Sequence, residues 1–151
     1  MPEDNEKIFA RITTSPLSAD SAYQFCLSPE NGAVDIFIGT VRNEFGGRPV
    51  EQIDYQAYPD MAEKILRTIL QSACGQWPLN KVYAVHRIGL LKVTEASIVV
   101  AVGAGHRGEA FEACRWIMEA IKRDLPVWKK EFFADGSVEW QHAGAAAISK
   151  K

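Results

Sequence analysis

Residues 96–107 read ASIVVAVGAGHR, and the rest of the chain is interpreted around this stretch. The run Ala96–Val102 is almost wholly apolar, which is typical of a strand buried on both faces at the centre of a sheet. The glycine-rich segment Gly103–Gly105 predicts a turn. From His106 to Lys122 apolar residues recur every three or four positions, so the pattern predicts a long helix that packs on this sheet.

The flanking segments extend the same alternation of strands and helices. We expect strands at 8–13, 33–42, 50–57, 81–88, 96–102, 127–133 and 137–140, and helices at 19–27, 59–74 and 106–122. Ser18 is placed to cap the first helix and Pro59 to begin the second. The order predicts an α+β fold with helices on one side of a mostly antiparallel sheet, two long helices and a C-terminal hairpin turning at Asp135-Gly136.

Two further local predictions depend on single residue types. Met61, Ile65, Ile69 and Ala73 are spaced to form the buried stripe of the second helix, which Gly75 would then end. The segment 43–49 contains Gly46-Gly47 and is expected to be a mobile loop.

Composition limits the function classes. The chain has 151 residues, 47% of them hydrophobic and 24% charged, which is typical of one globular domain. The formal net charge of −2 argues against a protein that coats nucleic acid or an anionic membrane through bulk charge. The longest apolar runs are far too short to span a bilayer, and residues 1–10 contain no apolar segment of a signal peptide.

The three cysteines, Cys26, Cys74 and Cys114, are widely spaced and form no CxxC pair. This pattern favours a reduced, cytoplasmic chain over a disulfide scaffold, and it argues against a zinc site. Because they lie on predicted helix faces or at a helix end, we interpret the cysteines as structural. His86 lies in a predicted strand beside Arg87 with no partner pair for a metal, so we interpret it as structural or at most interfacial.

Positive charge gathers at four places next to predicted structure breaks: Arg42, His106-Arg107, Lys122 and Lys129-Lys130. Each has an ordinary structural explanation as well. An arginine at a strand end is often simply solvated, and a lysine in a last helical turn is favoured by the helix dipole. Lysines on an edge strand guard against aggregation.

His106 and Arg107 are the more informative pair because they open the long helix. A helix N-terminus carries unpaired N–H groups and a partial positive charge, so basic residues there favour a phosphate or carboxylate ligand. His106 and Lys122 are 16 positions apart, or about 24 Å along a helix. One small ligand does not reach both ends, so they belong to separate sites or meet across a homodimer.

Seven short motifs follow one another along the chain. They are GTVRN (39–43), YPDM (58–61), WPL (77–79), HRIG (86–89), AGHR (104–107), AFEA (110–113) and IK followed by PVWKKE (121–131). Together they resemble the family of large, catalytic subunits of molybdopterin synthase. The resemblance covers about residues 32–140, so we expect one family domain over 1–151 in which 1–31 and 142–151 match weakly.

The resemblance implies a sulfurtransferase. In this family a small ubiquitin-like carrier brings sulfur as a thiocarboxylate on its C-terminal Gly-Gly, and the large subunit converts cyclic pyranopterin monophosphate into the molybdopterin dithiolene. The resemblance also implies an α/β-hammerhead-type fold, a homodimer with one carrier at each end, hence a heterotetramer, and no cofactor or metal in this subunit.

The resemblance also implies a set of site residues. The family's catalytic lysines fall on Lys122 and Lys129. Its substrate-binding positions fall on Thr40, Val41, Arg42, His106, Arg107, Lys130 and Glu131. The family places His106 and Arg107 across the dimer from the lysines, in agreement with the helix-length argument.

Two other function classes are open to a chain of this kind. The first is a non-catalytic dimeric module that binds a phosphorylated ligand or a ubiquitin-like protein. The second is an RNA-binding α+β domain, against which the acidic balance and the lack of an aromatic and basic stripe on one strand both count.

Overall fold

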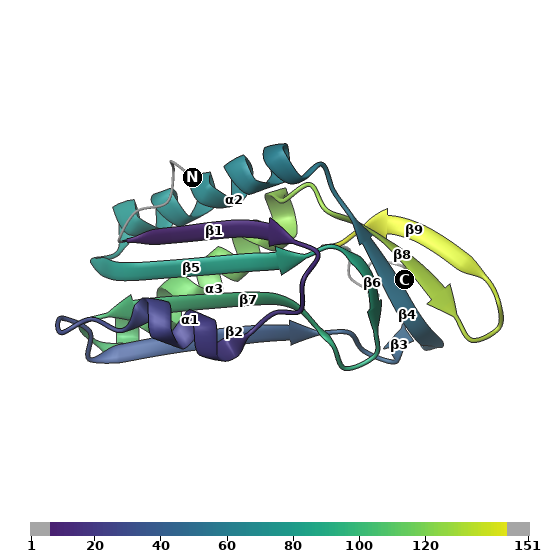
Figure 1. The fold of residues 1–151 in the computed structure, drawn as a ribbon, viewed down its shortest axis with the longest axis horizontal. Helices are drawn as coiled ribbons and strands as arrows, with labels where there is room; N and C mark the ends of the chain where they lie inside the picture. Colours follow the sequence, from purple (N-terminus) through teal and green to yellow (C-terminus); the bar gives the residue numbers. More distant parts are fainter. Residues whose placement is uncertain (1–6, 145–151) are drawn as a thin grey trace.

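Strand β7 (Ala96–Ala104) is buried along almost its whole length in the computed structural model, which describes residues 7–144. It pairs antiparallel with β2 (Ala33–Thr40) on one side and with β5 (Leu79–Arg87) on the other. β5 pairs in parallel with β1 (Ile8–Thr13), which completes a sheet of order β1-β5-β7-β2 (Figure 1). The predicted central strand is therefore confirmed.

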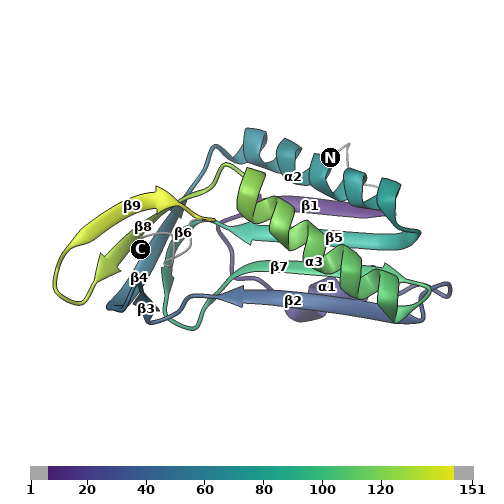
Figure 2. The same cartoon turned by 180° about the vertical axis from the view of Figure 1, so that it is seen from behind.

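Helices cover both faces of this sheet. The long helices α2 (Pro59–Gln76) and α3 (Arg107–Asp124) lie on one face, and the short α1 (Ala19–Cys26) lies on the other (Figures 1 and 2). The prediction that all helices share one side is wrong for α1. Ala22 and Cys26 of α1 pack in a small core of their own with apolar residues of β5 and β7, because both faces of these strands are apolar.

A second, antiparallel sheet stands at one end of the first (Figure 1). Its central strand, β4 (Arg48–Gln56), pairs with β8 (Trp128–Phe133) and β6 (Gly89–Lys92). The short β3 (Glu44–Phe45) also pairs with β4, and β9 (Val138–His142) pairs with β8. β8 and β9 form the predicted C-terminal hairpin.

Several local predictions are confirmed. The side chain of Ser18 caps α1 by accepting a hydrogen bond of 3.1 Å from the N–H of Ser21. Pro59 occupies the first turn of α2, where its missing N–H costs nothing. None of the helices between residues 7 and 144 is long and apolar enough to cross a membrane.

Other local predictions are wrong for identifiable reasons. The expected loop at 43–49 is instead the hairpin β3–β4, because Phe45 is buried and Gly46 and Gly47 adopt positive φ angles of 62° and 81° in a tight turn. Strand β6 carries no alternating pattern and was not predicted. In α2, Ile69 and Ala73 are buried as predicted and Ile65 is partly buried, but Met61 is 49% exposed, and the buried face also includes Ala62, Leu66 and Leu70.

The glycine-rich segment before α3 also differs from the prediction. β7 continues through Gly103 and Ala104, and α3 begins at Arg107 with His106 as its N-cap. A Cβ at Gly103 would overlap the side chain of Asn31, so glycine is needed there for close packing and not for a turn. Of the weakly matching ends at 1–31 and 142–151, residues 1–6 and 145–151 lie outside the described residues.

Candidate active site

A cavity of about 470 Å³ lies where the two sheets meet, beside the C-terminal end of α3. Its volume is in the range of pockets that enclose a small organic ligand. Six of the predicted site residues line it: Thr40, Val41, Arg42, Lys122, Lys129 and Glu131.

Three separate elements deliver these residues. β2 ends at Thr40, and the chain then passes from the first sheet to the second through Val41 and Arg42. Lys122 lies in the last turn of α3, where the helix dipole favours a cation. Lys129 and Glu131 are two positions apart on β8, so they lie on the same face of the strand, and this face lines the cavity.

Lys129 and Glu131 form a buried ion pair on this face of β8. Nζ of Lys129 lies 3.3 Å from Oε2 of Glu131, and the two side chains are 10% and 1% exposed. Gln141 of β9 donates a hydrogen bond from Nε2 to the other carboxylate oxygen, Oε1. The ring of Phe45 lies against the ammonium, with Nζ 4.5 Å from the ring centroid. Both oxygens of the carboxylate are thus occupied, and the carboxylate holds Lys129 in place.

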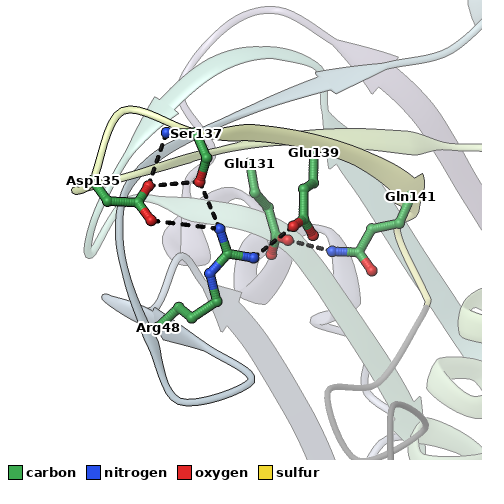
Figure 3. A network of polar contacts seen from close by, with 6 residues as sticks. All are labelled: Arg48, Glu131, Asp135, Ser137, Glu139 and Gln141. Atoms are coloured by element: carbon green, nitrogen blue, oxygen red, sulfur yellow. Dashed lines mark hydrogen bonds and ion pairs between the residues drawn. The ribbon is translucent and has the colours of Figure 1, made fainter.

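The hairpin that carries this pair is anchored by Arg48 of β4 (Figure 3). The guanidinium of Arg48 forms ion pairs with Glu139 at 2.5 Å and Asp135 at 3.8 Å, and it donates a hydrogen bond to Ser137. Asp135 also accepts hydrogen bonds from the backbone N–H and hydroxyl of Ser137, which closes the turn. Strands β8 and β9 are therefore tied to β4 beside the cavity.

Lys122 is held differently from Lys129, since its ammonium has no ion pair or hydrogen bond to any of residues 7–144. Its side chain is exposed beside the cavity, but the neighbouring wall removes part of its water. This desolvation lowers the pKa of Lys122, and the nearby cations Lys129 and Arg42 lower it further. A lysine with a lowered pKa exchanges protons more readily near neutral pH.

Arg42 supplies a further cation at the cavity. Its guanidinium lies 3.8 Å from the carboxylate of Glu44, with side chains 67% and 48% exposed. An ion pair this exposed is weak, so the guanidinium stays available to an anionic ligand. The cavity thus combines three cations with one buried carboxylate.

Three predicted site residues are not brought to this cavity within one chain. Lys130 points to the opposite face of β8, where its ammonium lies 5.2 Å from the ring centroid of Phe132 and 5.7 Å from that of Trp140. His106 and Arg107 are at the far end of α3. The His106 side chain is 88% exposed, with its Nδ1 3.8 Å from Glu109.

Among the lining residues that the sequence did not single out are two buried hydroxyl-bearing side chains, those of Tyr55 in β4 and Ser97 in β7. Both are buried in strands among apolar neighbours. Such positions normally indicate core, so no signal in the sequence singled them out.

The described residues show other features that bear on the chemistry. All three cysteines are free, and burial raises the pKa of Cys26 and of Cys114 to about 12. A thiol with this pKa carries almost no thiolate at neutral pH. Between residues 7 and 144 there is no group of three or more His, Cys, Asp or Glu side chains placed to hold a metal ion.

Comparison with known proteins places this geometry in a family. Residues 12–124 match the MoaE protein family. The molybdopterin synthase catalytic subunit of Emericella nidulans is 47% identical over 86% of this chain and 67% of its own length. The Bos taurus protein of the same name is 38% identical over 92% of this chain and 74% of its own length.

Solved structures also share the fold of this chain. Molybdopterin synthase from Staphylococcus aureus superposes with a TM-score of 0.84 at 33% identity, over 92% of this chain and 98% of that one. A complex of subunits 1 and 2 of the molybdopterin-converting factor from Helicobacter pylori 26695 shares the fold, with a TM-score of 0.67 at 19% identity, over 91% of this chain and 88% of that one. Because the matched region spans most of the sequence and the relatives are this similar, the chain belongs to the MoaE protein family.

Proposed function

We propose that this chain is the catalytic subunit of a molybdopterin synthase. It transfers sulfur from the C-terminal thiocarboxylate of a small ubiquitin-like carrier to cyclic pyranopterin monophosphate and so forms the molybdopterin dithiolene. Family membership and the names of the relatives support this activity. The observation that carries it is the cavity itself, which brings Lys122, Lys129 and Arg42 together from distant parts of the chain.

The proposed reaction needs no nucleophile from this chain. A thiocarboxylate sulfur is itself a good nucleophile, so the protein must instead stabilise developing negative charge and move protons. The raised pKa values of the buried cysteines agree with a supply of sulfur from outside. No cofactor or metal has a role in this mechanism.

We assign different roles to the two lysines because their surroundings differ. Lys122 has a lowered pKa and a side chain that borders the cavity, which suits proton donation to the departing oxygen. Lys129 is fixed by Glu131, which suits stabilisation of a developing oxyanion at one position. Arg42 binds the phosphate, since a guanidinium matches phosphate oxygens with two parallel hydrogen bonds.

The path of β2 and α3 supports a homodimer with shared sites. Both elements begin at the end of the sheet near Gly32, whose N–H donates to Ala104 at 3.0 Å, and both end at the cavity. β2 pairs only with β7 among the strands of residues 7–144, and its Phe37 and Ile38 are 41% and 44% exposed. Its outer edge is thus open to a second copy.

Antiparallel pairing of two β2 edges about a twofold axis would complete the site. A strand of eight residues is about 24 Å long, close to the distance from the start of α3 to Lys122. Such pairing sets the beginning of one β2 beside the end of the other. His106 and Arg107 of each copy then approach the other copy's cavity, where they add cations for the substrate phosphate, and Lys130 stays outside it.

The partner is the small carrier, and two carriers on one homodimer give a heterotetramer. The fold shared with the two-subunit Helicobacter pylori complex supports such a partner. The three free cysteines favour the cytoplasm as the compartment. We expect neither nucleic acid nor a membrane as a partner.

The test is reconstitution with purified components. The protein is mixed with thiocarboxylated carrier and cyclic pyranopterin monophosphate, and dithiolene is measured, with unthiolated carrier as the control. We expect product only with the thiocarboxylate. Binding of carrier and substrate without product would instead identify a non-catalytic module.

A further inference from the structure

Behind Lys122 lies a small inner chamber of about 40 Å³. Its wall includes Lys122 and three buried polar residues from neighbouring strands: Tyr55 of β4, His86 of β5 and Ser97 of β7. The remaining lining is mostly apolar. The volume suits one water molecule, and a buried water needs two to four polar partners of this kind.

His86 is the polar residue here whose hydrogen bonding is incomplete. Nδ1 lies 2.9 Å from the carbonyl oxygen of Arg87. A carbonyl only accepts, so this hydrogen bond requires the proton on Nδ1 and leaves a lone pair on Nε2. Burial lowers the pKa of His86 to about 4, so the ring is neutral at physiological pH. Tyr55 packs against the ring edge-on, with centroids 5.2 Å apart.

Nε2 of His86 has no hydrogen-bond partner among residues 7–144. In that part of the chain, the one fully enclosed side-chain polar atom without a hydrogen bond is Oε1 of Glu109. Nε2 therefore still borders space that a water molecule can enter. His86 is 5% exposed and lines the chamber, so the chamber is that space.

The two hydroxyls of the chamber each have a hydrogen bond within the protein. Burial raises the pKa of Tyr55, so its hydroxyl stays protonated, and a hydrogen bond with Ser97 partly offsets that rise. The hydroxyl of Ser97 lies 3.3 Å from the carbonyl oxygen of Gly39 and donates to it. Nε2 of His86 differs from both hydroxyls, because it is the polar atom of these three side chains that has a lone pair and no hydrogen bond within the described chain.

We propose that one water molecule in this chamber links Lys122 to His86, accepting a hydrogen bond from the ammonium and donating one to Nε2. His86 is then a positioning residue that acts through Lys122 and does not touch the substrate. It holds the ammonium at the cavity and stabilises its charged form. The proposal rests on the role given to Lys122 in the proposed function.

The charged and titratable groups that face Lys122 come from every element around it. They are Arg42, Glu44, Tyr55, His86, Lys129 and Glu131, together with Glu119 and Arg123 of its own helix. Arg42 and Lys129 lower the pKa of Lys122, and loss of an acceptor behind the ammonium would lower it further, because the charged form loses a hydrogen bond. Activity that needs the ammonium would then be lost at a lower pH.

The kinetic test compares His86→Phe, which removes the acceptor, with His86→Gln, which keeps one. We expect His86→Phe to lower kcat about tenfold with KM for the pterin changed less. The alkaline limb of the kcat–pH profile should move to lower pH by about one unit. His86→Gln should restore most of both. Equal effects of the two variants, or an unmoved limb, would overturn the proposal.

A second test needs no turnover, so it also works if the proposed function fails. Nitrogen-15 NMR of the imidazole groups is recorded on the unaltered protein and on Lys122→Met. We expect the proton of His86 on Nδ1, and an Nε2 resonance that moves in Lys122→Met. A proton on Nε2, or a resonance unaffected by Lys122→Met, would overturn the proposal even if a His86 variant does not fold.

Discussion

The carboxylate of Glu131 is almost completely buried, and the ammonium of Lys129 lies 3.3 Å from it on the same face of β8. A charge in such a position is stable only with its partner, because water no longer compensates it. The pair therefore has two roles. It keeps β8 in place against the cavity, and it directs one of the two lysines that the proposed reaction uses.

Removal of both members of this pair should cost less than the sum of the two single removals. We expect Glu131→Gln to lower the free energy of unfolding by about 3 kcal/mol, because Lys129 is left buried without its counter-charge. The double variant Lys129→Met/Glu131→Gln should cost clearly less than the sum of the two single changes. Urea unfolding of the four proteins measures this. Additive effects would show that the pair is not coupled.

Lys122 should be essential for turnover and dispensable for the fold. Its ammonium has no ion pair in the described chain and the residue as a whole is exposed, so little packing is lost on truncation. We expect Lys122→Ala to reduce kcat at least about 100-fold, with an unchanged melting temperature and unchanged carrier binding. Lys64→Ala, which removes an exposed lysine from α2, is the matched control and should be as active as the unaltered protein. Near-normal turnover by Lys122→Ala would refute its assigned role.

The free energy of unfolding should fall in acid because His86 is buried in its neutral form. Its pKa is about 4 in the folded chain and near the usual 6.5 when unfolded. Between these values the unfolded chain binds a proton that the folded chain does not, so stability falls as the pH falls from 6.5 to 4. The loss should approach about 3 kcal/mol.

The variant His86→Gln isolates this contribution. It retains every carboxylate, so acid unfolding from other groups is common to both proteins. We expect the unfolding free energy of His86→Gln to fall less steeply over this pH range. Parallel curves for the two proteins would mean that His86 is not held neutral by burial.

The sequence predicted the centre of the fold well and its margins less well. An apolar run such as β7 has one favourable place, between two strands and under helices. β3 and β6 are short, and their pairing depends on β4, which is distant from β6 in sequence. The second core under α1 was missed because an apolar strand does not show which element covers each face.

The sequence likewise predicted only some of the residues of the candidate site. Lys122, Lys129 and Arg42 were identified because cations beside strand and helix ends are unusual enough to notice, and because the motifs resemble a family. Tyr55, Ser97 and the unpaired Nε2 of His86 follow only from three-dimensional packing. In the sequence, His86 has the features of an ordinary buried residue.

The open edge of β2 should be the dimer interface. Ile38 is 44% exposed there, and a charge at this position would oppose burial against a second copy. We expect Ile38→Lys to be a folded monomer by analytical ultracentrifugation, with little product formation. Ile38→Val is the conservative control and should stay dimeric. A dimeric Ile38→Lys protein with full activity would place the interface elsewhere.

The central claim is that each active site joins Lys122 of one copy to Arg107 of the other, and subunit exchange tests it most directly. Lys122→Ala and Arg107→Ala dimers, each nearly inactive, are mixed in equal amounts, exchanged and assayed for dithiolene. Random exchange gives hybrids with one intact site in two, so about a quarter of the unaltered activity should return. If both residues served a site within one chain, no hybrid would contain an intact site. An absence of recovery after proven exchange would contradict the shared site.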